Sequence, residues 1–185
     1  VGTPYEDAMD DRDLQEFLNE KALRGHFGVF EHPQGSFFVE GLSRSAMAQV
    51  TRHRHMSFDV QSQRYVDFRD KEPVVPPSFK EHNDTWEKAL QAHWRDSIDH
   101  YEWAIDAGIP KEDARFFLPL AAPVNMTMSA NPRSLMHFLN LRDNAKAQWE
   151  ARQFAQEISE IASDWAPKSF KAYEEKTNNN SLRAP

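Results

Sequence analysis

The sequence predicts an α+β fold that is mostly helical by residue count. Long segments with apolar residues at helical spacing, a few short segments rich in aromatic and branched residues, and glycines or prolines at segment ends lead to this fold class. The chain has 185 residues, 39% hydrophobic and 28% charged, which suffices for one domain with a core. We therefore predict a single domain over 1–185, with a frayed polar tail at 177–185.

The first half of the chain is expected to combine short helices with extended segments. Apolar residues within 14–23 predict a helix that stops before Gly25, as helices commonly do before glycine. Ser43 is a good N-cap for a second helix, which is expected to run to about Arg52. The expected extended segments are 36–41 and 57–68.

The second half is expected to be richer in helices. Three prolines within 72–78 predict a non-helical surface connection. A long helix is expected next over 81–107 and ends at Gly108, and a short helix from Pro110 carries Arg115. The apolar segment over 118–128 suits a strand. Two more helices are expected after it, one from Pro132 and an amphipathic one from Ala145 to Trp165.

Composition excludes several classes of function. There is no cysteine, so the chain has no disulfide, no thiolate metal site and no cysteine nucleophile, and a reducing cytoplasmic location is expected. The net charge of −7 argues against nucleic acid as a partner. The longest uncharged apolar stretch, 116–124, is too short to span a membrane, and the glycine-rich phosphate loops are absent.

The beginning of the chain is unusual. Val1 is not a methionine, and residues 1–13 show no clear apolar period. We therefore expect processing or truncation at the N-terminus, and the acidic segment 5–13 does not look like a signal peptide.

The most unusual stretch is Arg52-His53-Arg54, followed by Gln61, Ser62 and Arg64. Consecutive helical residues point about 100° apart, so the three basic residues cannot share one face and must reach different groups. Arginine binds phosphate bidentately, and Ser62 and Arg64 would face the same way in an extended segment. The alternative is a solvated basic patch that offsets nearby aspartates.

A second polar cluster surrounds the helix expected from Pro132. Asn131 lies at the N-cap position, where backbone N–H groups favour anions, and Arg133 and His137 are four residues apart. Arg142 lies near the end of the helix. The alternative is simple capping by Asn131 and pairing of Arg142 with the helix dipole.

A third group comprises His26, Gly28 and the pair Glu31-His32. Two histidines in His53-x-His55 are a weak metal signal without a further ligand nearby, so we predict no metal site.

These clusters together resemble the flavin-dependent thymidylate synthases, the ThyX family. The spacing R-H-R-x7-S from Arg52 to Ser62 is similar to the family signature, and 131–142 with 147–150 is similar to its C-terminal signature. His26, 31–32 and Gln49 match upstream of the first block, and 63–65, 114–115 and 118–119 match between the two blocks, all in the right order.

The resemblance implies a fold with a small, mostly antiparallel sheet and flanking long helices. It implies conversion of dUMP to dTMP, with methylenetetrahydrofolate as the carbon donor, FAD as the hydride carrier and NADPH as its reductant. It also implies a homotetramer whose active sites are shared between subunits. The ligands are therefore expected to be small molecules, with no nucleic acid or membrane partner.

The resemblance also assigns residues to roles. Arg142 matches the residue thought to stabilise the uracil ring as its N3 loses a proton, and is the expected catalytic residue. The residues that match the dUMP-binding set are Gln49, Arg52, Gln61, Ser62, Arg64, Arg115 and Arg142. The residues expected to contact FAD are His26, Arg52, His53, Arg54, Asn131, Arg133 and His137.

Two positions depart from the family pattern. Val60 replaces a common glutamate or glutamine, and Gly28 replaces a common serine or threonine. Two alternatives to an active synthase stay open at this point. One is a non-catalytic nucleotide- or RNA-binding module that uses the Arg-His-Arg segment, and the other is a relic that binds FAD but turns over poorly because of Val60.

Overall fold

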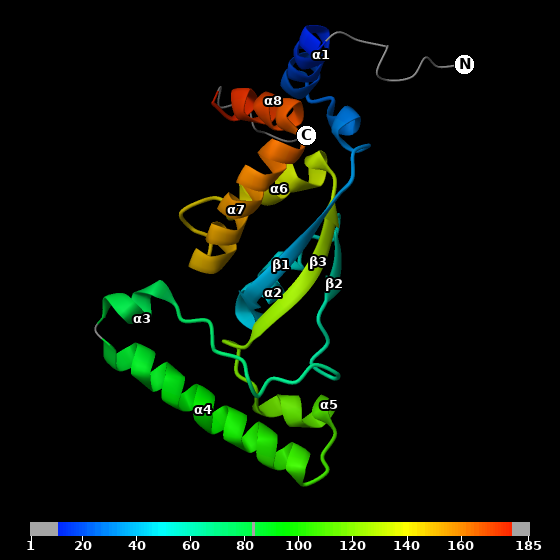
Figure 1. The fold of residues 1–185 in the computed structure, drawn as a ribbon. Coiled ribbons are helices and arrows are strands. Elements are labelled where there is room, and N and C mark those ends of the chain that lie inside the picture. The colour runs from blue at the N-terminus through cyan, green and yellow to red at the C-terminus, as the bar shows by residue number, and fades with distance from the viewer. Residues whose placement is uncertain (1–10, 83, 179–185) are drawn as a thin grey trace. The chain divides into compact units, whose positions relative to one another are not determined.

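The fold is known from a computed structural model, which describes residues 11–82 and 84–178. Three short strands form one antiparallel sheet, and most of the other elements are helices (Figure 1). This confirms the predicted α+β class. The chain divides into two compact units, which within the described residues are unit 1 (11–35, 129–147 and 152–178) and unit 2 (36–128 and 148–151). The prediction of one functional domain stays a prediction.

Unit 1 is a packed group of helices. Its elements are α1 (Asp11–Leu23), the 3-10 helix η2 (Phe27–Phe30), α6 (Pro132–Arg142), α8 (Pro167–Asn178) and the part of α7 (Trp149–Trp165) from Arg152 onward. Figure 1 shows α1 beside α8, and these two helices are in contact. Phe138 of α6 meets Phe154 of α7 edge to face, with ring centroids 5.6 Å apart. Buried aromatic rings therefore join the helices of this unit.

Unit 2 holds the sheet. The strands are β1 (Gly35–Ser43), β2 (Ser57–Val60) and β3 (Pro123–Ala130), and β3 lies between the other two. In β3 the alternate residues Val124, Met126 and Met128 are buried, as expected for a strand with one face on a core. The helix α2 (Arg44–Val50) connects β1 with β2 through a short loop. This connection carries the Arg-His-Arg segment.

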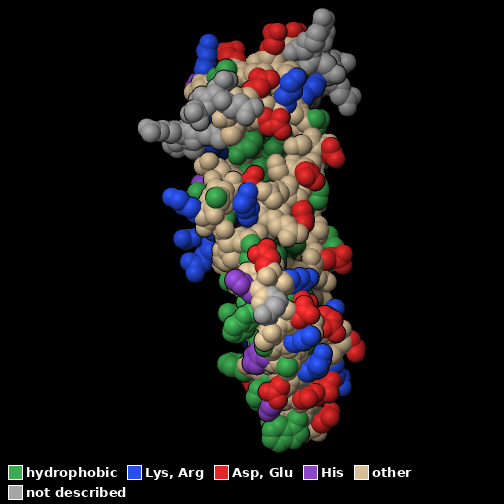
Figure 2. All heavy atoms as spheres, turned by 90° about the vertical axis from the view of Figure 1, so that its left-hand side faces the viewer, with side chains coloured by type: hydrophobic (Ala, Val, Ile, Leu, Met, Phe, Trp, Pro, Cys, Tyr) green, Lys and Arg blue, Asp and Glu red, His purple; other side chains and the backbone are tan. Residues whose placement is uncertain are grey.

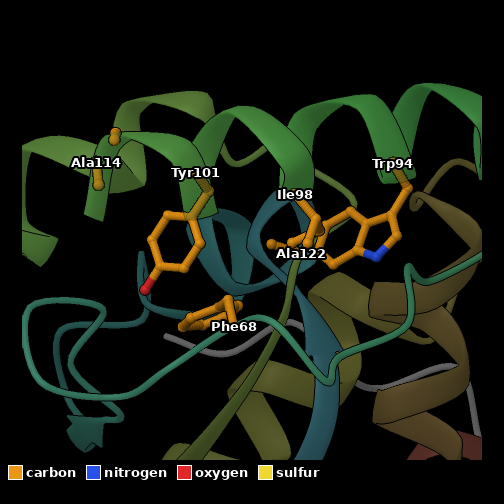
Figure 3. Close-up of a cluster of buried hydrophobic side chains, with 7 residues drawn as sticks. Phe68, Trp94, Ile98, Tyr101, Ala114 and Ala122 are labelled. Carbon is orange, nitrogen blue, oxygen red and sulfur yellow. The ribbon is translucent and has the colours of Figure 1, made fainter. Parts of the chain in front are cut away.

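A second part of unit 2 is built around the long helix α4 (Asp84–Asp106). It also contains α3 (Pro77–Glu81), α5 (Lys111–Ala114) and the 3-10 helix η3 (Arg115–Phe117). Figure 3 shows Trp94, Ile98 and Tyr101 extending from α4 toward Phe68 and Ala122. The surface seen in Figure 2 carries basic, acidic and hydrophobic side chains interspersed over the lower part of the molecule. The apolar face of α4 thus anchors the segment that runs on from the turn after β2.

Most expected helices are confirmed, with small shifts of their ends. The helices expected at 14–23 and 81–107 are α1 and α4, and both are followed by a glycine with positive φ, +76° at Gly25 and +85° at Gly108. The strands expected at 36–41 and within 118–128 are β1 and β3. The helix expected over 145–165 is α7, which begins at Trp149 rather than Ala145. The helix after it, α8, was not expected.

Two expectations are wrong. The extended segment expected over 57–68 stops at Val60, because a turn follows it. The connection expected over 72–78 is non-helical only up to Pro76, since Pro77 opens α3 at a helix position where its missing N–H has no cost. The polar tail from 179 onward and the N-terminal residues 1–10 lie outside the described residues, whereas 177–178 belong to α8.

Candidate functional site

The Arg-His-Arg segment directly follows α2. Ser43 caps this helix as expected, because its Oγ accepts a hydrogen bond from the Ala46 N–H at 3.0 Å. The helix ends two residues before Arg52, and turns then carry Arg52, His53 and Arg54. The position of the basic residues is therefore set by where α2 begins and ends.

The three residues of this segment lie in turns rather than on a helix, so the helical argument for their different directions does not apply, but they do differ in exposure. His53 is buried, with 8% exposed, whereas Arg52 and Arg54 are exposed. Neither arginine forms an ion pair with any residue of 11–82 or 84–178. Asp67, one of the aspartates expected to offset the segment, instead pairs with Arg69 at 2.6 Å. Two cationic side chains are thus available to an anionic ligand.

The N-terminus of α2 is held by a buried carboxylate. Glu150 is 7% exposed, and its oxygens accept hydrogen bonds from the Ser43 N–H at 2.6 Å and from the Ser43 hydroxyl at 2.5 Å. Ser43 therefore bonds to Glu150 and caps α2 with the same side chain. A buried carboxylate with such partners fixes the orientation of the helix that leads to Arg52.

The residues after β2 form a turn, and the expected common face of Ser62 and Arg64 is wrong. The Ser62 hydroxyl accepts a hydrogen bond from the Arg64 N–H at 3.2 Å, and the Ser62 carbonyl accepts from the N–H groups of Tyr65 and Val66. A serine that bonds to nearby backbone groups favours a turn over a strand. Gln61 stays attached to the sheet, since its N–H donates to the Asn125 carbonyl at 2.8 Å.

Two arginines of the expected dUMP-binding set meet at Glu112 of α5. The Arg64 Nη2 lies 2.6 Å from Glu112 Oε2, and the Arg115 Nε donates to the Glu112 carbonyl at 2.9 Å. The Arg64 guanidinium also lies over the Tyr65 ring, 5.7 Å from its centroid. Unit 2 thus brings together two cationic groups that are 51 positions apart in sequence.

The same turn is tied to α5 by a second ion pair. Lys111 lies 3.3 Å from Asp67 and donates to the Tyr65 carbonyl at 3.5 Å. The hydrogen bond from Arg69, assisted by Lys111, holds the pKa of Asp67 well below its ordinary value. Asp67 is therefore a charged anchor of the turn.

Unit 1 carries most of the residues expected at the flavin. Asn131 caps α6 through its Oδ1, which accepts from the Ser134 N–H at 2.8 Å. Arg133 and His137 follow on the helix, with His137 exposed, and Arg142 is its last residue and is half-buried. The capping expected of Asn131 is confirmed, and it leaves the anion role of this residue as a prediction.

Arg133 lies over an aromatic ring that sequence analysis missed. Its guanidinium carbon is 4.1 Å from the centroid of Phe27, and the Lys176 ammonium is 4.4 Å from the same centroid. Lys176 also donates to the Ala22 carbonyl at 2.7 Å, and burial, with a smaller effect of the Arg133 charge, lowers its pKa. Two cations therefore lie close to the ring of Phe27. The only sequence signal for Phe27 was that it follows His26, an expected site residue.

An open hollow in unit 1 gathers the third sequence group. Its volume is 590 Å³, and its lining includes His26, Gly28, Glu31 and His32 together with Lys21 and Val29. A Cβ atom added to Gly28 would meet nothing within 4 Å, and the backbone there does not have the positive φ that favours glycine. Neither local crowding nor backbone conformation therefore requires glycine at this position.

Another hollow, in unit 2, has a volume of 190 Å³. Its lining is mainly apolar, with Ser43 and Glu150 on one side, and none of the expected site residues belongs to it. Val60, the second departure, is the last residue of β2 and is half-buried. Gln49 lies on α2, one turn before Arg52 and half-buried.

The expected site residues fall into two groups by unit. Unit 2 holds Gln49, Arg52, His53, Arg54, Gln61, Ser62, Arg64 and Arg115, and unit 1 holds His26, Asn131, Arg133, His137 and Arg142. The dUMP-binding set therefore lies mainly in unit 2 and the flavin set mainly in unit 1. Sequence analysis missed Glu112, Phe27 and Lys176, and it gave Glu150 no role beyond its place in the C-terminal signature. The contacts of these residues with Arg64, Arg133, Ala22 and Ser43 join positions distant in the chain.

Two kinds of feature are absent from the described part of the chain. Within 11–82 and 84–178, no three His, Asp or Glu side chains are grouped closely enough to hold a metal ion. Among the helices in that part of the chain, none has the length and apolar content needed to cross a membrane.

Comparison with known proteins points to one family. Residues 2–168 match the family described as thymidylate synthase complementing protein. The chain is similar to proteins named flavin-dependent thymidylate synthase. The relative from Haloarcula marismortui is 43% identical over 180 positions, which cover 82% of this chain and 71% of the relative. The relative from Halobacterium salinarum is 39% identical over 206 positions, which cover 93% of this chain and 83% of the relative. The relative from Geobacter sulfurreducens is 42% identical over 164 positions, which cover 86% of this chain and 69% of the relative.

Proposed function

Because the chain belongs to the family of flavin-dependent thymidylate synthases, we propose that it converts dUMP to dTMP. Methylenetetrahydrofolate is the proposed carbon donor, FAD the proposed flavin and NADPH its proposed reductant. The family match over residues 2–168 carries this proposal. The absence of any cysteine agrees with it, since the uracil ring must then be activated without a thiolate.

The phosphate of dUMP is assigned to unit 2. A phosphate dianion is best bound by arginine side chains in bidentate geometry. Arg64 and Arg115 meet at Glu112, and Arg52 is exposed with no ion pair in the described part of the chain. Ser62 and Gln61 lie beside Arg64 and complete the proposed set, together with Gln49 on α2. The Ser62 hydroxyl is proposed as a ligand rather than a nucleophile, and its bond to the Arg64 N–H at 3.2 Å holds it beside the proposed phosphate arginine.

The uracil ring is assigned to Arg142, the proposed catalytic residue. A fixed cation beside a ring nitrogen that loses a proton stabilises the negative charge that develops there. Arg142 ends α6, so its backbone is held by the helix and by the buried residues Leu135, Phe138 and Leu139. The helix thereby fixes the backbone from which this cation extends.

The residues present fit a flavin dinucleotide. A pyrophosphate needs cations and N–H donors, and the arginines of the expected FAD set, Arg54 in unit 2 and Arg133 in unit 1, are residues of that kind. Within unit 1, His26 lines an open hollow of 590 Å³. Asn131, His53 and His137 are also proposed to contact the cofactor, and Arg52 belongs to both proposed sets, for FAD and for dUMP. The flavin, when bound, supplies the hydride that reduces the transferred carbon. The chain's own residues hold the nucleotide and stabilise charge.

We further propose a homotetramer with active sites shared between subunits, and a cytoplasmic location. Shared sites would let the exposed residues Arg52 and Arg54 reach ligands held partly by another copy. The proposed tetramer rests on the resemblance to the family, and the proposed location rests on the absence of cysteine.

The test is a direct assay. Purified full-length chain is incubated with FAD, its visible absorption spectrum is recorded, and dUMP, methylenetetrahydrofolate and NADPH are then added. A bound flavin spectrum and formation of dTMP that depends on all three substrates are expected. Protein that takes up no flavin and forms no dTMP would overturn the proposal, and flavin uptake without turnover would indicate the relic, for which Val60→Glu should restore activity.

A further inference from the structure

Two arginines of the proposed dUMP site are held by one residue of α5. Glu112 Oε2 is 2.6 Å from Arg64 Nη2, and the Glu112 carbonyl accepts a hydrogen bond from Arg115 Nε at 2.9 Å. A guanidinium carries five N–H donors in a planar fork. The bonds to Glu112 therefore occupy one edge of each arginine and leave other donors for a ligand.

We propose that Glu112 is a positioning residue, which orients Arg64 toward the dUMP phosphate beside Arg115. The inference rests on the proposed function, because the ligand is the nucleotide of that reaction. Glu112 belongs to neither of the two sets of residues proposed to bind dUMP and FAD, so its role is new.

The contact with Arg64 is reinforced by the neighbouring residue. Lys111 pairs with Asp67 at 3.3 Å and donates to the Tyr65 carbonyl, so α5 also holds the residues that follow Arg64. The Ser62 hydroxyl closes the turn on its other side by accepting from the Arg64 N–H. The backbone of Arg64 is thereby fixed, and Glu112 then selects among the rotamers of its long side chain.

The ion pair between Arg64 and Glu112 is expected to contribute little to the free energy of folding. The side chains of Arg64 and Glu112 are 52% and 44% exposed, and ion pairs of this kind contribute little to folding. An arginine that is already ordered loses less rotamer freedom when it binds a ligand, and this gain is expressed in affinity. The contact is therefore expected to affect binding rather than stability.

The negative charge of Glu112 acts in the opposite direction, because it repels phosphate. This repulsion is weakened by solvent at so exposed a site, and the charge is matched at contact distance by Arg64 itself. The hydrogen bond that orients Arg64 acts at 2.6 Å, where screening by salt is smaller than over longer distances. We therefore expect removal of the carboxylate to weaken dUMP binding.

The experiment measures the Kd of dUMP for the full chain loaded with FAD, by titration calorimetry. Glu112→Ala removes the carboxylate but keeps the backbone carbonyl that binds Arg115. The Kd is expected to rise roughly threefold to tenfold, the loss expected when one long side chain must be ordered on binding. The KM for dUMP should rise in parallel while kcat changes little. Asp113→Asn, an exposed neighbour on the same helix, is the matched control and should leave the Kd unchanged.

A double-mutant cycle separates positioning from a general effect. In an Arg64→Ala background, Glu112→Ala should have no further effect, because its target is gone. In an Arg115→Ala background, Glu112→Ala should still raise the Kd by its full factor. Binding of deoxyuridine, which lacks the phosphate, should be the same in the parent and in Glu112→Ala.

The outcomes are distinct. A flavin-loaded parent that does not bind dUMP would overturn the proposed function, and this inference with it. If the parent binds dUMP and Arg64→Ala weakens binding, a Glu112→Ala variant with equal or tighter binding overturns the positioning role alone. A loss that persists in full in the Arg64→Ala background also overturns it, and so does an Arg64→Ala variant with unchanged affinity.

Discussion

The Arg133 guanidinium lies over the ring of Phe27, with its central carbon 4.1 Å from the ring centroid. Lys176 lies 4.4 Å from the same centroid. A cation above an aromatic face is attracted by the ring electrons, and the attraction is larger where water is excluded. Phe27 is 6% exposed, so it orients a residue of the proposed flavin site from inside unit 1.

Phe27→Leu should therefore weaken flavin binding. Leucine keeps most of the apolar volume but removes the ring face, so Arg133 loses its orienting surface. We expect the Kd for FAD to rise roughly threefold to tenfold and the free energy of unfolding to fall by about 1–2 kcal/mol. Fluorescence titration and urea unfolding measure the two effects.

Phe17→Leu is the matched control for this substitution. Phe17 also lies beneath a cation, with Lys21 Nζ 4.9 Å from its centroid, and belongs to neither expected ligand set. It should lose some stability without a change in the Kd for FAD. Equal weakening of flavin binding in both variants would argue that Phe27 acts only through the stability of unit 1.

The bond between Ser43 and Glu150 predicts a strong effect on stability. Glu150→Ala leaves the buried Ser43 N–H without its partner and should lower the free energy of unfolding by about 2–4 kcal/mol. Urea unfolding measures this loss. Glu160→Ala removes an exposed carboxylate from the same helix and should change stability by less than about 0.5 kcal/mol. Similar values for the two variants would show that the buried bond contributes nothing.

The elements that sequence predicted best are those with local end signals. Ser43 and Asn131 were expected to cap helices, and both accept the backbone N–H three residues later. Gly25 and Gly108 were expected to end helices, and both have positive φ. These signals work because a cap or a left-handed residue is decided by neighbours within one turn.

The features that the sequence analysis missed have two causes. Some depend on local hydrogen bonds that compete with strand formation, and others on contacts between residues far apart in the sequence. The alternation over 57–68 favoured a strand, but the Ser62 side chain and carbonyl bind the following N–H groups and form a turn. The contacts of Glu112 with Arg64 and of Phe27 with Arg133 join residues that are far apart in the chain. Motif spacing identified the arginines but held no information on the groups that orient them.

Asp67 predicts a dependence of stability on pH. Its pKa is lowered in the folded state, chiefly by the hydrogen bond from Arg69, so its stabilising effect is full above the ordinary aspartate pKa of about 3.9. The effect is lost as pH falls below that value toward the folded pKa. Asp67→Asn should thus be less stable than the parent at neutral pH, and the difference should shrink progressively below about pH 4.

Urea unfolding of both proteins between neutral pH and the acid limit measures this difference. Asp70→Asn is the control, since Asp70 is exposed and forms no ion pair within the described residues. It should follow the parent at every pH. A difference for Asp67→Asn that stays constant down to the lowest pH would contradict the role of its charge.

Arg142→Ala should lower turnover far more than flavin occupancy. If the arginine stabilises negative charge on the uracil ring, its loss removes an interaction that is strongest in the transition state, and kcat should fall roughly a hundredfold. Arg142→Lys keeps the charge without the planar fork and should recover part of the rate. Arg152→Ala, which removes an exposed arginine paired with Asp143 at 4.0 Å, should leave kcat unchanged. Flavin content from the visible spectrum and dTMP formation, measured on the same samples, separate the two effects. Parallel losses of flavin and turnover in Arg142→Ala would assign this residue to cofactor binding instead of catalysis.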